Sequence, residues 1–274
     1  MKVAVLGLGL IGGSIARDLA AAGHDVLGFD RSAATLRAAR RARVIRGSIG
    51  RDFAALAACD ACVIAVPVSD APRLLARAAR ALATVPLVTD AGSTKRSIVR
   101  AAERLGLAHR FVGSHPLAGD HRAGWKASRR HLFRGAPVFL TPTRSTLPAT
   151  LVRARRLWRV FGARPRVLSA AAHDRLMAGA SHLPQVVSSA LGATLARARV
   201  PRSALGPGGR DVTRLAGADV RVWSAIVRDN ADHLVFLLDG YGRMVRRMRA
   251  AVAASDARPL RKLLVSAARW HRAP

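Results

Sequence analysis

The sequence begins with a short apolar run that leads directly into three regularly spaced glycines, "KVAVLGLGLIGGS". Gly7, Gly9 and Gly12 have GxGxxG spacing, and residues 11–22 then place apolar side chains three and four apart, as in a helix. Between a strand and a helix, the first glycine permits a tight turn, the second lets a pyrophosphate approach the backbone, and the third allows close helix packing. The order of strand, glycines and helix therefore predicts a Rossmann-type dinucleotide-binding domain.

An acidic residue ends the next expected strand, "DVLGFD". An acid at the position of Asp30 accepts hydrogen bonds from the adenosine ribose and repels a 2′-phosphate, which favours NAD. Arg31 beside it can accommodate a phosphate, so NADP remains an alternative. We predict that the following residues bind the cofactor: Gly7, Gly9, Leu10, Ile11, Gly12, Asp30, Arg31, Val66, Pro67 and Ser93.

The first part of the chain continues to alternate strand-like runs with helical patterns, and this alternation predicts an α/β, doubly wound parallel sheet. After residue 168 the chain is long, apolar and free of strand signals. We therefore expect a Rossmann-like NAD-binding domain at residues 1–167 and an all-helical domain at residues 168–274. The helical patterns cover residues 71–83, 96–105, 149–161, 220–249 and 256–269, and a last edge strand is expected at residues 164–168.

The formal net charge of the chain is +30, which raises the question of a nucleic-acid partner. Only four of the 46 basic residues are lysines, and the arginines are spread along the chain without interleaved aromatic residues. This pattern is typical of a compositional bias, so we expect no nucleic-acid partner, although a nucleotide-sensing, DNA-binding regulator is an open alternative. No uninterrupted apolar run reaches about 18 residues, and the N-terminus lacks signal-peptide features, so we expect no membrane span and a cytoplasmic location.

Two patterns in the sequence suggest metal or redox chemistry. Cys59 and Cys62 form a CxxC, but there is no second cysteine pair for zinc, and the motif leads into a strand rather than a helix, so we interpret both as structural. His173 and Asp174 resemble a metal-binding pair without further ligands at suitable spacing, and we interpret them as structural or near the site. We expect no bound metal.

Two later strands end in "DAGSTK" and "GSHP", which place Ser93 and His115 at strand ends. Ligands of open α/β sheets bind outside the carboxyl ends of the strands, so both side chains are expected near the nicotinamide. A neutral histidine can accept the hydroxyl proton as hydride leaves an alcohol carbon. Ser93 would orient either the imidazole or that hydroxyl, and the alternative for His115 is a hydrogen bond within a turn.

Five segments in order, "GLGLIGGS", "DAGSTK", "SHPLAG", "SHLPQ" and "GGRDVTRLAGADVRVW", make the chain resemble the prephenate/arogenate dehydrogenases of tyrosine biosynthesis. The resemblance implies an enzyme that oxidatively decarboxylates prephenate to 4-hydroxyphenylpyruvate with NAD, and a homodimer formed through the helical domain. Arogenate and amino-deoxyprephenate are alternative substrates. A β-hydroxyacid dehydrogenase is disfavoured, because Lys262 lies too near the C-terminus to be the lysine that such enzymes use.

The resemblance also implies roles for individual residues. His115 matches the catalytic base and Ser93 the serine at the nicotinamide edge. The residues matched to substrate binding are His182, Arg214 as the carboxylate clamp, Asp211, Trp223 and, in a position where the family often has glutamate, His121. Gln185 stands where the family often has a second histidine, and Ala123 where arogenate-using plant relatives have aspartate, so we favour prephenate.

Overall fold

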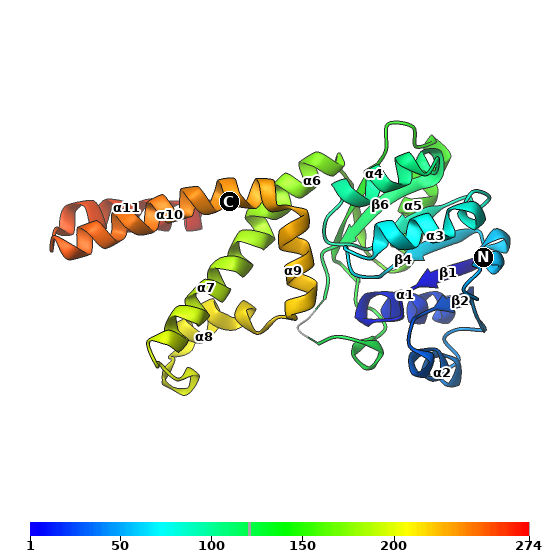
Figure 1. Ribbon diagram of the computed structural model, residues 1–274, viewed down its shortest axis with the longest axis horizontal. Coiled ribbons are helices and arrows are strands. Elements are labelled where there is room, and N and C mark those ends of the chain that lie inside the picture. The colour runs from blue at the N-terminus through cyan, green and yellow to red at the C-terminus, as the bar shows by residue number, and fades with distance from the viewer. Residues whose placement is uncertain (120–121, 274) are drawn as a thin grey trace. The chain divides into compact units, whose positions relative to one another are not determined.

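The computed structural model describes residues 1–119 and 122–273, which divide after residue 230 into two compact units. The first unit contains a central sheet of eight strands in the order β3-β2-β1-β4-β5-β6-β7-β8 (Figure 1). Neighbouring strands are parallel except β6 and β7, which are antiparallel, so the predicted doubly wound sheet is confirmed with one reversed pair. The strands are β1 (Lys2–Leu6), β2 (Asp25–Phe29), β3 (Gly47–Ser48), β4 (Ala61–Ile64), β5 (Val88–Asp90), β6 (Phe111–Pro116), β7 (Pro137–Pro142) and β8 (Arg164–Val167).

Helices cover both faces of this sheet, because successive side chains of a strand point to opposite faces. Val3 and Val5 of β1 pack in one core with α1 and α5, whereas Ala4 and Leu6 pack in the other with α3 and α4. The helices around the sheet are α1 (Leu10–Ala21), α2 (Ala33–Arg41), α3 (Ala71–Leu82), α4 (Arg96–Arg104) and α5 (Pro148–Val160), with short 3₁₀ turns at η1 (Ala54–Ala58), η2 (Ala108–Arg110) and η3 (Trp125–Ala127).

The carboxyl ends of four parallel strands meet at one edge of the sheet. Leu6, Ile64 and Asp90 are register partners across β1, β4 and β5, and β6 runs parallel beside them and ends with His115 and Pro116. The strand order reverses between β1 and β4, and open α/β sheets bind ligands outside the carboxyl edge at such a reversal. The fold therefore brings the glycine turn, the "DAGSTK" loop and His115 to the same edge.

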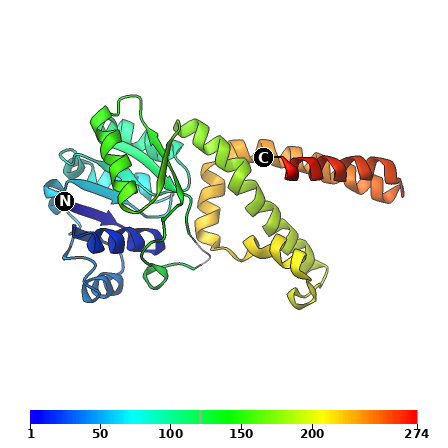
Figure 2. The same ribbon diagram turned by 180° about the vertical axis from the view of Figure 1, so that it is seen from behind.

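The first unit continues beyond the sheet with helices only, as the sequence predicted. A π-helical turn separates α6 from α7, and Pro184 lies in the first turn of α7, where its missing N–H is not needed. Helix α7 packs against α8 and η6 (Figure 2). These elements are α6 (Ala170–Met177), the π-turn η4 (Ala178–His182), α7 (Leu183–Arg197), η5 (Arg202–Ala204), α8 (Pro207–Thr213), η6 (Arg214–Gly217) and α9 (Val220–Asp229).

The second unit consists of α10 (Ala231–Ala253) and α11 (Ala257–Arg272), which pack against each other. The single helical pattern at residues 220–249 is interrupted at Asn230, whose backbone is not helical. In the described part of the chain, no helix is both long and apolar enough to cross a bilayer.

Cys59 and Cys62 are buried free thiols, which agrees with the structural interpretation. Burial raises the pKa of both thiols, most strongly that of Cys62, and this keeps them in the unreactive protonated form.

Candidate active site

The three glycines of the first turn have different structural reasons to be glycine. Gly7 has a φ of +96°, and a Cβ there would lie 2.6 Å from the carbonyl oxygen of Ala65. A Cβ on Gly12 would lie 1.8 Å from the carbonyl oxygen of Gly7. Around Gly9, in contrast, no described atom other than those of its chain neighbours and its own helix lies within 4 Å of the corresponding position. Packing fixes the first and third glycines, and the second leaves open space in front of the α1 N-terminus, where a phosphate fits the free N–H groups and the helix dipole.

Asp30 is held beside this turn by the backbone. Its Oδ2 accepts a hydrogen bond from the N–H of Leu8 at 2.8 Å, and its Oδ1 accepts one from the N–H of Ser32 at 2.8 Å. Each carboxylate oxygen keeps a lone pair for a further donor. Arg31 is exposed, and Val66 and Pro67 follow β4, where Val66 lies against Gly7. The residues present therefore fit a dinucleotide, with the carboxylate placed for a ribose.

A buried ion pair organises the loop after β5. The Nζ of Lys95 donates to Oδ2 of Asp90 and, at 2.7 Å, to the carbonyl oxygen of Ser114, and neither charged side chain has any solvent exposure. Asp90 also accepts from the N–H groups of Gly92 (2.8 Å) and Ser114 (3.0 Å). These bonds tie the "DAGSTK" loop to the strand residue that precedes His115. Lys95 was not among the predicted site residues, although a lysine in the loop that follows a buried strand ending in aspartate was a usable signal.

His115 lies at the carboxyl end of β6 and is partly exposed. Its Nδ1 is 2.9 Å from Nε2 of His173, and no described residue forms a hydrogen bond with its Nε2. Burial, reinforced by His173, Lys95 and His182, holds the pKa of His115 well below its ordinary value. The imidazole is therefore neutral near pH 7 and has a free nitrogen, which is the state that a proton acceptor requires.

Ser93 lies on the loop between β5 and α4 and is partly buried. Among the described residues its hydroxyl has no hydrogen-bond partner, and the group that contacts the imidazole of His115 is His173. The role left for Ser93 is that of a contact to substrate or cofactor, and this stays a prediction.

His182 ends the π-helical turn and is buried. Its Nδ1 lies 3.1 Å from Nδ2 of Asn230, whereas its Nε2 is buried and has no partner among the described residues. Burial, with a smaller effect of His173, lowers the pKa of His182 to about 4 despite the opposing charge of Asp174. Because the Asn230 amide donates, the neutral ring of His182 carries its proton on Nε2, as an unused donor.

The other predicted substrate residues are distributed differently. Trp223 on α9 is half-buried, and its ring lies edge-on to that of His182, with centroids 6.1 Å apart. Asp211 and Arg214 are exposed, and among the described residues no contact joins either to His115. His121 lies outside the described residues. Gln185 donates to the carbonyl oxygen of Leu215 at 2.7 Å, and its own amide oxygen is buried without a described partner.

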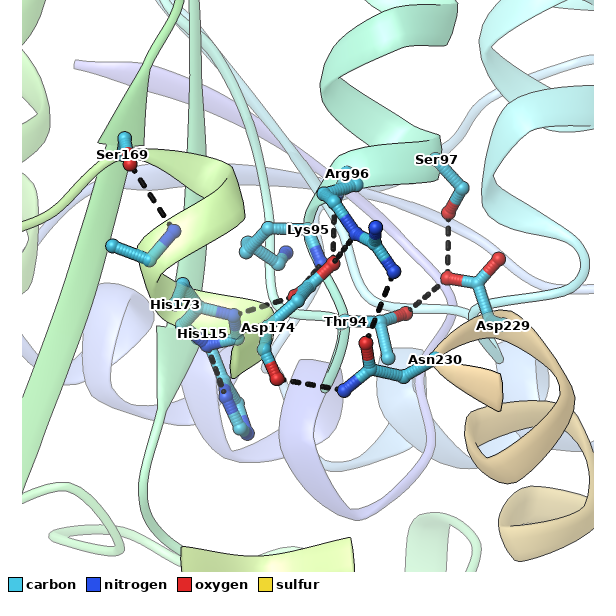
Figure 3. Close-up of polar contacts among 12 residues, drawn as sticks. Thr94, Lys95, Arg96, Ser97, His115, Ser169, His173, Asp174, Asp229 and Asn230 are labelled. Atoms are coloured by element: carbon cyan, nitrogen blue, oxygen red, sulfur yellow. Dashed lines mark hydrogen bonds and ion pairs between the residues drawn. The ribbon is translucent and has the colours of Figure 1, made fainter. Parts of the chain in front are cut away.

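The His173–Asp174 pair lies directly at the site (Figure 3). Both side chains are fully buried, and Nδ1 of His173 is 2.8 Å from Oδ1 of Asp174. The contact between His173 and His115 agrees with the interpretation of the pair as near the site. The described part of the chain contains no cluster of three or more metal-ligating side chains.

Sequence comparison with known families agrees with this geometry. The family model described as "Prephenate dehydrogenase, nucleotide-binding domain" matches residues 15–167, and "Prephenate dehydrogenase, dimerization domain" matches residues 169–266. The chain belongs to the prephenate dehydrogenase family. Membership makes the protein an oxidoreductase with a nucleotide-binding Rossmann-type domain followed by a helical domain, and the family resemblance read from the sequence is confirmed.

Individual relatives of the prephenate dehydrogenase family match almost the whole chain. A cyclohexadienyl dehydrogenase of Zymomonas mobilis is 32% identical over 262 residues, which cover 93% of this chain and 89% of the relative. A prephenate dehydrogenase of Bacillus subtilis is 31% identical over 95% of this chain and 73% of its own length.

Solved structures of the family superpose well on the chain. The prephenate dehydrogenase of A. aeolicus in complex with hydroxyphenyl propionate and NAD+ has a TM-score of 0.88 and 27% identity, and the match covers 99% of this chain and 97% of the other. An arogenate dehydrogenase of Synechocystis has a TM-score of 0.80 and 28% identity over 97% of each chain.

Proposed function

We propose that this protein catalyses the NAD-dependent oxidative decarboxylation of prephenate to 4-hydroxyphenylpyruvate in tyrosine biosynthesis. The observation that carries the proposal is the neutral His115, which presents a free ring nitrogen at the carboxyl edge of the sheet that also holds the glycine turn. A base there serves to accept the C4 hydroxyl proton of the substrate.

The cofactor would be held by the glycine turn, the α1 N-terminus and Asp30. The space at Gly9 admits a pyrophosphate, and the Asp30 carboxylate favours a ribose with free hydroxyls over one with a 2′-phosphate. The A. aeolicus relative of known structure binds NAD+. When bound, the nicotinamide supplies the hydride acceptor, and the remaining task of the chain is to orient the substrate and take its proton.

The substrate is a dicarboxylate, and the helical part of the chain offers donors to it. His182 has an unused Nε2–H, and Trp223 packs against its ring. Arg214 is exposed and, with a planar fork suited to a carboxylate, is proposed as the clamp, with Asp211 beside it. We assign these residues to the domain that spans residues 168–274, after a Rossmann-like domain at residues 1–167.

Arogenate is the second candidate substrate, because the chain is similar both to an arogenate dehydrogenase and to a cyclohexadienyl dehydrogenase. Arogenate carries an amino group in place of the keto oxygen of prephenate, so an acidic residue near that end would favour it. Ala123 provides none, which supports prephenate.

The proposal is tested by following reduced nicotinamide with prephenate or arogenate, each with NAD or NADP. We expect the highest kcat/KM with prephenate and NAD. In His115→Asn we expect kcat to fall at least ~10²-fold, the usual contribution of a positioned general base, while the Kd for NAD is unchanged. Absence of turnover with both substrates would refute the function, and near-normal turnover by His115→Asn would remove His115 from the mechanism.

A further inference from the structure

The proposed mechanism assigns no role to His173 and Asp174, which lie beside His115. His173 and Asp174 lie in the first turns of α6, on the far side of the imidazole from its free nitrogen. Both have no solvent exposure. The three side chains form a continuous line of hydrogen bonds, with 2.9 Å between Nδ1 of His115 and Nε2 of His173 and 2.8 Å between Nδ1 of His173 and Oδ1 of Asp174 (Figure 3).

Asp174 sets the direction of these hydrogen bonds, because its carboxylate is ionised. Burial alone would favour its neutral acid, but hydrogen bonds from His173 and from the N–H groups of Arg96 and Lys95 outweigh burial and lower the pKa of Asp174. Its Oδ1 accepts from the N–H of Lys95 at 2.8 Å, and its Oδ2 accepts from the N–H of Arg96 at 2.9 Å and from Nε of Arg96 at 3.3 Å. A carboxylate in this state can only accept hydrogen bonds.

The positions of the ring protons follow from the ionised carboxylate. Since Asp174 only accepts, Nδ1 of His173 must carry the proton that it donates. Burial lowers the pKa of His173, although the hydrogen bond to Asp174 opposes this effect, so the ring is neutral. The neutral ring has a lone pair on Nε2, which accepts from Nδ1–H of His115. A neutral His115 with its proton on Nδ1 has a lone pair on Nε2. The chain of bonds thus allows only the tautomer in which the free nitrogen is basic.

We propose that His173 and Asp174 are positioning residues for the reaction proposed above, which hold His115 in the tautomer and orientation that leave Nε2 unprotonated. The ring of His173 is itself held in place by Phe139 of β7, with ring centroids 5.6 Å apart. Without this partner, the His115 ring would be free to place its proton on Nε2, and that form cannot accept a proton from a substrate. In a serine protease, the wrong tautomer of the catalytic histidine costs ~10⁴-fold in turnover.

A purely structural role for the pair is the rival explanation, because Asp174 also binds the N-terminal N–H groups of α4. Substitution of Asp174 would disturb α4 as well as His173, so the test uses His173. His173→Phe removes the acceptor for His115. His173→Gln can retain it, since the amide oxygen can accept from His115 while the amide nitrogen donates to Asp174.

The first measurement is kinetic. We expect His173→Phe to lower kcat at least ~10²-fold with an unchanged Kd for NAD, and His173→Gln to stay within ~10-fold of the wild type, because the tautomer is kept. His109→Gln, which removes a histidine that contacts Arg110, serves as the matched control and should leave kcat unchanged. In a His115→Asn background, His173→Phe should have no further effect on kcat. An equal loss in both backgrounds, or a Gln variant as inactive as Phe, would overturn the proposal.

The second measurement does not depend on turnover, so it separates this inference from the proposed function. Nitrogen-15 NMR of the imidazoles reports which ring nitrogen carries the proton. We expect the Nδ1–H form of His115 in the wild type and in His173→Gln, and a substantial Nε2–H population in His173→Phe. An Nε2–H tautomer in the wild type would overturn the assignment, whatever the protein catalyses.

Discussion

Lys95 is a charged side chain that the fold encloses completely. Its ammonium group faces the carboxylate of Asp90 and the carbonyl oxygen of Ser114, and all three groups are shielded from solvent. Burial lowers the pKa of Lys95, although the carboxylates around it oppose this effect. Removing one member of a buried ion pair typically costs about 3–5 kcal/mol, because the other charge is left unpaired. The pair therefore stabilises the connection between the end of β5 and Ser114, the residue before His115.

Gly9 is the residue at which cofactor binding can be separated from stability. Its φ of −73° suits any L-residue, and the space at its Cβ position is open. In Gly9→Ala we expect the melting temperature to stay within a degree or two of the wild type, while the Kd for NAD rises at least ~10-fold, because a methyl group would occupy the path of the pyrophosphate. Thermal unfolding and a fluorescence titration measure the two quantities.

Gly12→Ala is the matched control for this experiment. Its methyl group would collide with the carbonyl oxygen of Gly7, so the variant should lose stability as well as cofactor affinity. A Gly9→Ala protein that binds NAD as tightly as the wild type would contradict the placement of the pyrophosphate at the turn.

At the scale of elements, Asn230 follows α9 and joins three parts of the site. Its amide donates to the carbonyl oxygen of Asp174 at 2.7 Å and to Nδ1 of His182, and its oxygen accepts from Arg96. In Asn230→Ala we expect the free energy of unfolding to fall by about 1–3 kcal/mol, the cost of unsatisfied buried groups. We also expect KM for prephenate to rise, because His182 loses its tautomer constraint. Urea unfolding and steady-state kinetics measure these effects.

Asp219→Ala, at the other end of α9, is the control, because it should also lower the free energy of unfolding. Asp219 accepts from the N–H groups of Arg221 and Val222 as a helix N-cap, and its loss should cost ~1 kcal/mol with no change in KM. A KM shift of equal size in both variants would attribute the Asn230 effect to helix stability alone.

Helices and strands were predicted well where the hydrophobic periodicity and the turn residues at the ends of a segment indicated the same boundaries. Strands β1 and β2 occupy the predicted residues, because each is a short apolar run bounded by polar or turn residues. The two-residue strand β3, the π-helical turn and the interruption at Asn230 were not predicted, since none of them changes the local hydrophobic pattern. Their positions depend on tertiary contacts with residues that are distant in the sequence.

The same limit applies to the site. The placement of the glycine turn and of His115 at strand ends was predictable, because each signal lies within one strand and its following turn. The bond between His115 and His173 joins residues 58 positions apart, and the partners of the buried Lys95 lie on β5, β6 and α6. The His173–Asp174 pair could be identified in the sequence, but its contact with His115 could not be predicted from it.

At the scale of the whole molecule, the second unit exposes many large apolar side chains. Phe236 is 73% exposed on α10 and Trp270 is 81% exposed on α11, and Leu234 and Ala251 are the only buried residues among those described in this unit. Two helices bury too little apolar surface to be stable alone in water. We therefore propose that these helices contribute to a homodimer, in line with the family's dimerization domain.

The dimer is tested with Phe236→Asp. A charge at a buried contact is strongly unfavourable, so we expect the variant to shift toward monomer, measured by sedimentation velocity over a range of concentrations. Val152→Asp, at an apolar position on α5 that is 52% exposed, should leave the sedimentation coefficient unchanged. A wild-type protein that sediments as a monomer at all concentrations would contradict the proposed assembly.

The line of hydrogen bonds behind His115 has a consequence for how the protein can be divided. The proposed base, His115, belongs to the sheet, but the residues proposed to orient it lie in α6, after the segment that the nucleotide-binding family model covers. A chain that stops after β8 would contain all the residues proposed to bind the dinucleotide, but it would lack His173, the hydrogen-bond partner of His115. We therefore expect such a chain to keep the proposed coenzyme site, whereas the proposed proton acceptor would lose the partners that fix its tautomer until α6 is also present.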